Sequence, residues 1–371
     1  MSAAADGLRR QNPTTFVLTP APATQPLDLP GIRRAVDAVL TDFLRHKAHA
    51  DTDTALPGEV TQLLHDFLFA GGKRLRPLLC VIGWHVGPNH AKPPPPALIQ
   101  TAASLEMFHA FALIHDDLMD RSATRRNRPT VHRAMTEHHN NQHIGNSAAI
   151  LLGDLAQTWS SELLHTAGLK SRQLTAILPL IDTMRTEVMY GQYLDITAGK
   201  PSPDLDLALR IARYKSAKYT VERPLQIGAT LTGADPHIHT VLSAYALPAG
   251  EAFQLRDDLL GTFGTPELTG KPTLDDLREG KHTALLALAL RHATPTQLHD
   301  LHTLIGNTDL DETGAQHIRR LLITIGARDQ IETMITTRRT TALRALNDPA
   351  LPPATATTLA QLLNALTART T

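Results

Sequence analysis

Two clusters of aspartates are the residues in this sequence best suited to chemistry. Asp116, Asp117 and Asp120 share one five-residue stretch, Asp257 and Asp258 share another, and each stretch ends an apolar run with helical spacing. Carboxylates one helical turn apart repel each other, and burying them costs more still. Mg²⁺ takes carboxylate oxygens and shares its other positions with water and substrate phosphates. The spacing therefore predicts a metal-bridged diphosphate, with a solvated acidic helix end as the alternative.

Basic residues occur in short, separated groups that suit a second anion. Lys73 and Arg76 lie one helical turn apart after two glycines, which allow the backbone to approach a phosphate closely. Arg125 and Arg126 follow the first aspartate cluster within a short loop, and guanidinium groups fit diphosphate oxygens. Further candidate cations are Lys215, Lys271 and Lys281. Together these groups imply two anionic substrates, one held through metals and the other by side chains alone.

The elements that position these residues are predicted to be helices. Apolar residues recur at helical spacing from about Gly31 onwards, and no comparable run alternates as a strand would. The longest segments cover about 96–120, 172–198, 204–231 and 237–261, which predicts an all-α bundle of long antiparallel helices around a central cavity. We expect one domain over residues 31–371. The proline-rich residues 1–30 are expected to form a disordered lead.

Composition narrows the class of protein. Among 371 residues, Lys plus Arg and Asp plus Glu number 36 each, so we expect no nucleic-acid partner. We expect no apolar run of spanning length and no signal sequence. The single cysteine, Cys80, fits a reducing compartment, so the predicted location is cytoplasmic. The histidines at 138, 139 and 143 match no closed metal site and are interpreted as a solvated loop.

In sequence order, these motifs resemble the trans-isoprenyl diphosphate synthases, also called polyprenyl synthetases, over roughly residues 35–345. Within that family the chain is most similar to short-chain geranylgeranyl diphosphate synthases. The motifs that carry the resemblance are Gly71–Pro77, Asp116–Asp120, Arg125-Arg126, Pro129–His132, Gly191–Asp195, Lys215–Ala217, Phe253–Asp258 and Gly270-Lys271.

The resemblance implies an all-α homodimeric prenyltransferase that condenses isopentenyl diphosphate with an allylic diphosphate. It implies about three Mg²⁺ ions, bound through Asp116, Asp120 and Asp257, with Asp117 and Asp258 in supporting positions. Isopentenyl diphosphate would be gripped by Lys73, Arg76, His109 and Arg126. The allylic diphosphate would be contacted by Arg125, Lys215, Gln254, Lys271 and Lys281, of which Lys215, Gln254 and Lys271 are expected to be catalytic.

Product length should depend on side chains that precede the first aspartate cluster. In the family the growing chain runs down this helix, so Phe111 and Ala112 would lie about 6–7.5 Å below the metals. An aromatic residue at 111 resembles the geranylgeranyl-making type, which predicts geranylgeranyl diphosphate as the main product. Phe108, one turn further down, is the residue most able to shorten the product to farnesyl diphosphate. Core packing is the alternative role for Phe111.

Some positions depart from the family pattern. Gly261 stands where the second motif usually has a third aspartate, which questions one outer carboxylate, and Asn127 replaces a glycine that it should be able to mimic. For both Gln192 and Asp195, two roles are equally open: water-mediated metal contact and helix packing. Two other functions stay open: a class I terpene cyclase, which needs no second anion clamp, and a non-catalytic subunit that keeps the fold.

Overall fold

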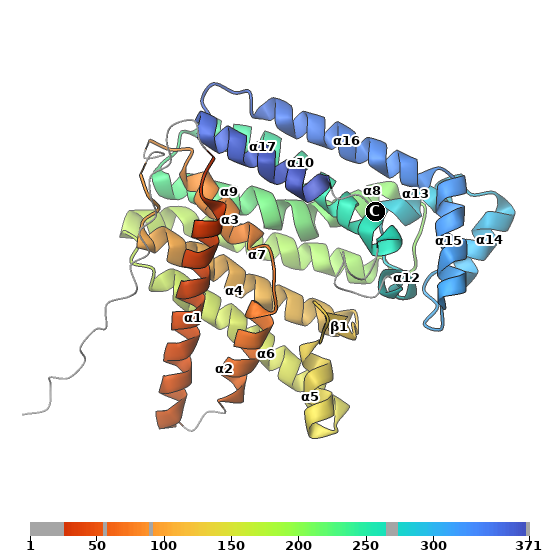
Figure 1. The fold of residues 1–371 in the computed structure, drawn as a ribbon, viewed down its shortest axis with the longest axis horizontal. Helices are drawn as coiled ribbons and strands as arrows, with labels where there is room; N and C mark the ends of the chain where they lie inside the picture. Colours follow the sequence, from red (N-terminus) through yellow and green to blue (C-terminus); the bar gives the residue numbers. More distant parts are fainter. Residues whose placement is uncertain (1–25, 55–57, 89–91, 265–273, 369–371) are drawn as a thin grey trace, which may run out of the picture.

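The computed structural model describes residues 26–54, 58–88, 92–264 and 274–368, and it is almost entirely helical (Figure 1). The only strands in these ranges are β1 (Thr124–Arg125) and β2 (Arg128–Pro129), which pair antiparallel. The helices are α1 (Leu29–Thr54), α2 (Glu59–Phe69), α3 (Leu75–Trp84), α4 (Pro96–Met119), α5 (Val131–His139), α6 (Gln142–His165), α7 (Ser171–Thr197), α8 (Leu205–Ile211), η1 (Ala212–Glu222), α9 (Arg223–Thr232), α10 (Pro236–Phe263), α12 (Asp275–Glu279), α13 (Ala284–His292), α14 (Pro295–Leu304), α15 (Glu312–Thr324), α16 (Ala327–Ala345) and α17 (Pro353–Thr367). The prediction of an all-α bundle is confirmed.

Three of the four long predicted segments are single helices, and the fourth is not. The segment predicted as one helix over 204–231 consists of α8, the π-helix η1 and α9 in succession. A π-helix has a wider turn than an α-helix and is frequent at functional sites. Helical spacing of apolar residues could not reveal this change, because both helix types keep one buried face. The long helical segment predicted near 204–231 is confirmed, and the prediction did not specify that residues 212–222 within it form a π-helix.

The helix boundaries follow from local sequence chemistry. Asp235 accepts a hydrogen bond from the amide of His237, and Pro236 occupies the first turn of α10, so this helix starts at the predicted break. Asn141 caps α6 by accepting from the amides of His143 and Ile144. Asn141 therefore caps a helix, and His143 lies inside the first turn of that helix instead of in a loop.

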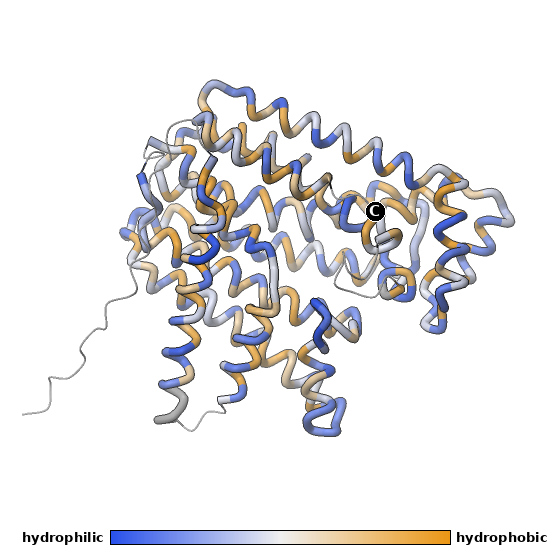
Figure 2. The backbone as a smooth tube through the Cα atoms, viewed as in Figure 1, coloured by the Kyte–Doolittle hydropathy of each residue, from blue (hydrophilic) through white to orange (hydrophobic). Residues whose placement is uncertain are grey.

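Helix α4 lies at the centre of the molecule and packs against α6, α3 and α1 (Figure 1). Figure 2 shows apolar residues concentrated on the inner sides of the helices. By length and composition α4 could cross a membrane, which corrects the expectation that no apolar run reaches that length. However, 72% of its most apolar window is buried inside the protein, as in the core helix of a bundle.

The first helix begins slightly before the predicted boundary at Gly31. Helix α1 starts at Leu29, and the Leu27 amide donates to Thr358 Oγ1 of α17 at 3.0 Å. This contact ties the start of the described chain to its last helix. The rest of the predicted lead, residues 1–25, lies outside the described residues.

Candidate active site

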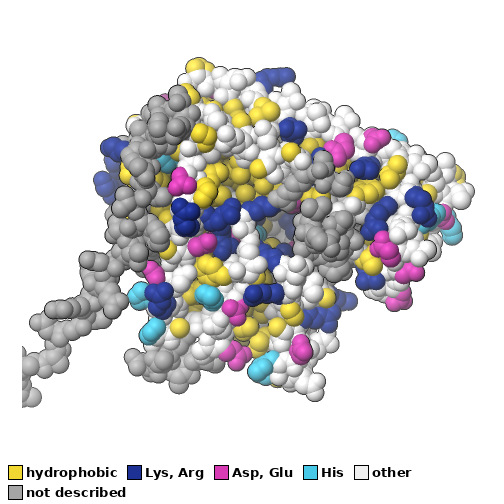
Figure 3. Space-filling view, in the orientation of Figure 1, with side chains coloured by type: hydrophobic (Ala, Val, Ile, Leu, Met, Phe, Trp, Pro, Cys, Tyr) yellow, Lys and Arg dark blue, Asp and Glu magenta, His cyan; other side chains and the backbone are white. Residues whose placement is uncertain are grey.

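A cavity of about 550 Å³ brings both aspartate motifs and most of the predicted cations together. Figure 3 shows Lys and Arg side chains grouped around a hollow in the middle of one face. The cavity lies between α3, α4, η1, α10 and α12. The predicted site residues that line it are Lys73, Arg76, His109, Asp116, Arg125, Arg126, Lys215, Gln254, Asp257, Asp258 and Lys281. Residues far apart in sequence thus share one space.

The first motif ends α4 and is surrounded by cations. Lys215 Nζ lies 2.9 Å from Asp116 Oδ1 and 2.6 Å from Asp195 Oδ2. Although burial acts to raise it, the pKa of Asp116 is held below its usual range by Lys215, Lys281 and Arg125. Burial lowers the pKa of Lys215, but the neighbouring carboxylates raise it by a larger amount, so the lysine stays charged. Asp116 is therefore an ionised carboxylate.

Asp117 and Asp120 extend this network on either side of Asp116. Arg125 donates through Nε to Asp117 Oδ2 at 2.6 Å, and its Nη2 lies 3.4 Å from Asp116 Oδ2. Lys281 Nζ lies 3.3 Å from Asp120 Oδ2. Burial is the main cause that raises the pKa of Asp120, and the charge of Asp116 adds to it. Asp117 and Asp120 do not themselves line the cavity, but both contact a cation that does.

The second motif, on α10, has a different environment. The Gln254 amide donates to Asp258 Oδ1 at 2.8 Å, and no lysine or arginine among the described residues forms an ion pair with Asp257 or Asp258. Removal from water raises the pKa of Asp257 to about 7, and the charge of Asp276 adds to the shift. The pKa of Asp258 is also raised to about 7, mainly by desolvation and then by Asp276 and Asp257. Within the described part of the chain, the charge of Lys281 lowers the pKa of Asp258 less than burial and the neighbouring carboxylates raise it.

These carboxylates fit a divalent cation whose coordination shell is completed by a substrate. Buried Asp117 Oδ1 has no hydrogen-bond partner, and burial with the neighbouring carboxylates raises the pKa values of Asp257 and Asp258, which a bound cation would lower again. Oxygen donors of this kind suit Mg²⁺. Within the described ranges, the two motifs do not bring three ligand atoms within 4.8 Å of one another. Such an open arrangement leaves positions for phosphate oxygens and water.

The predicted isopentenyl diphosphate clamp lies on the same cavity. Arg76 donates through Nη2 to Thr220 Oγ1 at 2.6 Å, and its guanidinium carbon lies 4.1 Å from the centre of the Tyr219 ring. His109 Nδ1 lies 3.4 Å from the Tyr219 hydroxyl. Burial first, and then the nearby arginines, hold the pKa of His109 well below its usual value, so its imidazole is neutral. Arg126 Nη1 donates to the Gly71 carbonyl at 2.5 Å.

Two glycines explain how η1 positions Lys215. A side chain at Gly191 of α7 would overlap the backbone at Lys215, and one at Gly250 of α10 would overlap Ala217. Both helices therefore approach η1 closely on two sides, and the approach of α7 brings Asp195 to Lys215. Asp195 is thus an ion-pair partner of a site lysine, and Gln192 donates to Met119 Sδ at 3.7 Å.

Several predicted residues are not brought into the cavity. Phe108 and Phe111 are buried, with ring centres 5.1 Å apart, and neither they nor Ala112 line it. Helix α4 reaches the cavity through His109, Leu113 and Asp116, a neighbouring face. Gly270 and Lys271 lie outside the described residues.

Three acidic residues and one arginine complete the site but were missed by sequence reasoning. Buried Arg74 has a left-handed backbone (φ 54°) and joins Asp37 Oδ1 at 2.7 Å to Glu106 Oε1 at 3.1 Å, which fixes the loop that carries Lys73. Glu279 Oε2 lies 2.9 Å from Lys281 Nζ. Nothing in the local spacing marks Asp37, Glu106 or Glu279, since each meets its partner only through the fold.

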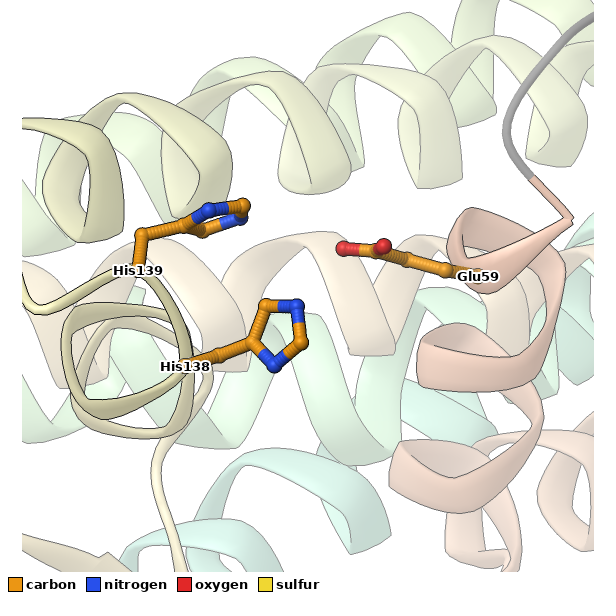
Figure 4. A group of neighbouring side chains, drawn as sticks. All are labelled: Glu59, His138 and His139. Atoms are coloured by element: carbon orange, nitrogen blue, oxygen red, sulfur yellow. The ribbon is translucent and has the colours of Figure 1, made fainter.

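A separate group of metal-ligating side chains lies on the surface (Figure 4). Glu59 at the start of α2 and His138 and His139 at the end of α5 place their ligand atoms within 4.8 Å of one another. All three side chains are exposed, and their donors suit Zn²⁺ better than Mg²⁺. None of the three residues in this group lines the cavity.

Comparison with known proteins identifies the family. The family model for Polyprenyl synthetase matches residues 57–322. The chain is 32% identical to the geranylfarnesyl diphosphate synthase of Aeropyrum pernix, over 80% of this chain and 87% of that one. It is 36% identical to the (2E,6E)-farnesyl diphosphate synthase of Mycobacterium tuberculosis, over 66% and 63% of the two chains.

The fold matches as well. A crystal structure of geranylgeranyl pyrophosphate synthase from Corynebacterium glutamicum, complexed with isoprenyl diphosphate and magnesium, superposes with a TM-score of 0.88 at 37% identity, over 93% of this chain and all of that one. The resemblance found in the motifs is confirmed. Since the family model covers most of the chain, and both aspartate motifs line one cavity with the Lys73, Arg125-Arg126 and Lys215 motifs, the protein belongs to the polyprenyl synthetase family and is a prenyltransferase of that magnesium-dependent family.

Proposed function

We propose that this protein condenses isopentenyl diphosphate with an allylic diphosphate and makes mainly geranylgeranyl diphosphate. The observation that carries this proposal is the pairing of two anion sites in one cavity, one rich in carboxylates and one in which lysine and arginine predominate. The magnesium and isoprenyl diphosphate named for the Corynebacterium structure support both halves. A class I terpene cyclase would not need the second site, so the clamp argues against that alternative.

The half in which lysine and arginine predominate would hold isopentenyl diphosphate. Lys73, Arg76 and Arg126 supply the positive charge, and neutral His109 can donate one hydrogen bond without adding repulsion. Arg76 is preorganised, because Thr220 and the Tyr219 ring already fix its guanidinium group. Its Nε is buried without a hydrogen-bond partner and is thus available to a phosphate oxygen.

The carboxylate half would hold the allylic diphosphate through about three Mg²⁺ ions, with Asp116, Asp120 and Asp257 as ligands and Asp117 and Asp258 in support. These ions would neutralise the diphosphate as it leaves. Lys215 and Lys281 now contact carboxylates, and they are placed to turn to phosphate oxygens when the ions bind. We assign Arg125, Gln254 and Lys271 to the same diphosphate, Lys271 on the family pattern alone.

The reaction then needs no protein nucleophile. The allylic carbon–oxygen bond breaks, and its electron pair leaves with the diphosphate, which Lys215 stabilises. The double bond of isopentenyl diphosphate attacks the resulting allylic cation, and one carbon–carbon bond forms. A proton then leaves the new cation for the departed diphosphate. The surrounding apolar helices would keep out water, which would otherwise capture the cation.

Activity of the purified chain tests the enzyme against the non-catalytic alternative. The protein alone, with Mg²⁺, radiolabelled isopentenyl diphosphate and farnesyl diphosphate, should yield a labelled prenyl diphosphate. Absence of product with every allylic primer would favour a subunit that only keeps the fold. Retention of nearly all the charged site residues supports catalysis.

The division into two sites has its own test. Arg76→Ala should raise KM for isopentenyl diphosphate about 10-fold or more with a smaller change for the allylic substrate, because no metal helps to hold isopentenyl diphosphate. Lys215→Ala should instead lower kcat, since it removes stabilisation of the leaving group. Equal effects of both variants on both substrates would contradict the division.

Product length is the least constrained part of the proposal, and Phe108, Phe111 and Ala112 are its proposed determinants. The growing chain would have to displace or pass the rings of Phe108 and Phe111, which contact each other at a tilt. Phe111→Ala should lengthen the product and Ala112→Phe should shorten it towards farnesyl diphosphate, as chromatography of the dephosphorylated products would show. An unchanged product in both variants would contradict this assignment without affecting the enzyme class.

The surface of α6 and α7 supports a homodimer. Among the described residues nine large apolar side chains are exposed, and all but Ile323 lie on α6, on α7 or at Met119 at the end of α4. Leu151 is 68% exposed and Tyr193 is 63% exposed. A patch of this kind marks an interface. Leu151→Glu should convert a dimer into a monomer in light scattering, with Ile323→Glu as the matched control. We also propose a cytoplasmic location.

A further inference from the structure

The glycine that interrupts the second aspartate motif shares its space with another carboxylate. Gly261 is the last residue of the Asp257–Gly261 motif on α10. A Cβ built on Gly261 would overlap Oδ2 of Asp276, and it would lie 3.1 Å from Cγ of the same side chain. Asp276 comes from α12, which packs against α10. Its carboxylate therefore fills the volume into which a side chain at position 261 would project.

Asp276 also has the surroundings of a site residue. It lines the cavity together with Asp257 and Asp258. Its Oδ1 lies 3.4 Å from Lys281 Nζ, and the same ammonium contacts Asp120 of the first motif. The side chain is 33% exposed, so water and ligands in the cavity can reach it. One lysine thus links this carboxylate to the opposite metal-binding motif.

We propose that Asp276 supplies the third carboxylate of the second aspartate motif, in place of the residue that Gly261 lacks, and helps to hold the ion at Asp257. This inference rests on the proposed magnesium-dependent function. The two positions depend on each other, because residue 261 must stay small for Asp276 to keep its position. Gly261 is then part of the site's construction and not a sign of lost activity.

Metal affinity tests this inference apart from turnover. Mn²⁺ can replace Mg²⁺ as a paramagnetic probe, and its free concentration is measured by electron paramagnetic resonance in the presence of inorganic diphosphate. Asp276→Ala should weaken Mn²⁺ binding about 10-fold, as expected for loss of a supporting carboxylate. The double variant Gly261→Asp/Asp276→Ala should recover affinity to within about 3-fold of the original protein. Gly261→Asn/Asp276→Ala, which restores volume without charge, should not.

Unchanged Mn²⁺ affinity in Asp276→Ala would overturn the proposal, as would equal recovery by the Asn and Asp double variants. A second cycle covers the case in which the double variants do not fold. If Asp276 only positions Lys281, then Asp276→Ala should have no further effect on Mn²⁺ affinity in a Lys281→Met background. If Asp276 holds the ion, the loss should persist there. Failure of the original protein to bind Mn²⁺ at all would instead contradict the proposed function.

Discussion

The two aspartate motifs line one cavity, but the protein surrounds them with different charges. Asp116 and Asp120 are met by Lys215 and Lys281, whereas Asp257 and Asp258 are met by an amide and by a further carboxylate. The pKa of Asp116 is accordingly lowered, and the pKa values of the second pair are raised to about 7. Cations of the protein thus hold Asp116 ionised at the first motif, whereas the aspartates of the second motif have no ion-pair partner among the described residues.

This difference suggests that the two motifs assemble in different ways. The cations at the first motif are built in, so its carboxylates are in place before any ion arrives. At the second motif no lysine or arginine of the described chain forms an ion pair with Asp257 or Asp258, so an ion from solution would supply balancing charge and couple the assembly of this motif to metal and diphosphate. Three predictions follow from the contrast and are ordered by the size of the expected effect.

The largest effect should be on catalysis, where the two motifs should be equally indispensable. Asp116→Ala and Asp257→Ala should each lower kcat/KM about 1,000-fold, because each removes a ligand of an ion that stabilises the leaving diphosphate. Initial rates with labelled isopentenyl diphosphate measure this, and circular dichroism checks the fold. Asp66→Ala, at an exposed aspartate of α2, is the control. A variant that kept more than about a tenth of the activity, a loss under about 1.4 kcal/mol, would lose its assignment as a ligand.

Without metal, substitutions in the two motifs should change the free energy of unfolding in opposite directions. Asp116→Asn leaves Lys215 and Arg125 without their shared charge partner, so the free energy of unfolding should fall by about 2 kcal/mol. Asp257→Asn removes a like charge from a group that lacks a cation, so the free energy of unfolding should rise by about 1 kcal/mol. Urea unfolding with a chelator present measures both.

The contrast would fail if both substitutions shifted the urea midpoint in the same direction. Asp66→Asn serves again as an exposed control, since its carboxylate is 53% exposed and should contribute little. In the presence of Mg²⁺ and diphosphate, Asp257→Asn should lower the free energy of unfolding instead of raising it, because the bound ion then needs the Asp257 charge.

The sequence predicted the residue types of the site better than their contacts. Helical spacing and the aspartate clusters were enough to place α4 and α10, because the period of apolar residues and the cost of clustered charge are local properties. The π-helix η1, the pairing of Lys215 with Asp195 and the fixing of Arg74 by Asp37 and Glu106 could not be predicted in this way. They arise where separate helices approach, at distances that the sequence does not encode locally.

Position 261 illustrates the same limit. From the sequence, Gly261 looked like the loss of one carboxylate, since the motif was compared only with its own neighbours. The fold brings Asp276 into the vacant volume from another helix. A departure from a motif is therefore interpretable only when the space around it is known.

The smallest effect should be in the pH dependence of stability without metal. For Asp257 and Asp258 the folded-state pKa of about 7 lies above the usual 3.8, so the folded protein binds more protons than the unfolded chain between these values. Their contribution to the free energy of unfolding therefore falls as pH rises from about 4 to about 7 and stays constant above that. Asp257→Asn/Asp258→Asn removes both titrations, so its gain over the original protein should grow from about pH 4 to about pH 7.

The difference between the two proteins is the informative quantity, because histidines titrate in the same range. Burial and nearby arginines lower the pKa of His109, which makes the folded protein bind fewer protons and gives a slope of opposite sign. That slope is common to both proteins and cancels in the difference. Urea unfolding at several pH values with a chelator present measures this difference. A double variant whose gain did not change with pH would show that the second motif is already neutralised by the protein, and the contrast between the motifs would disappear.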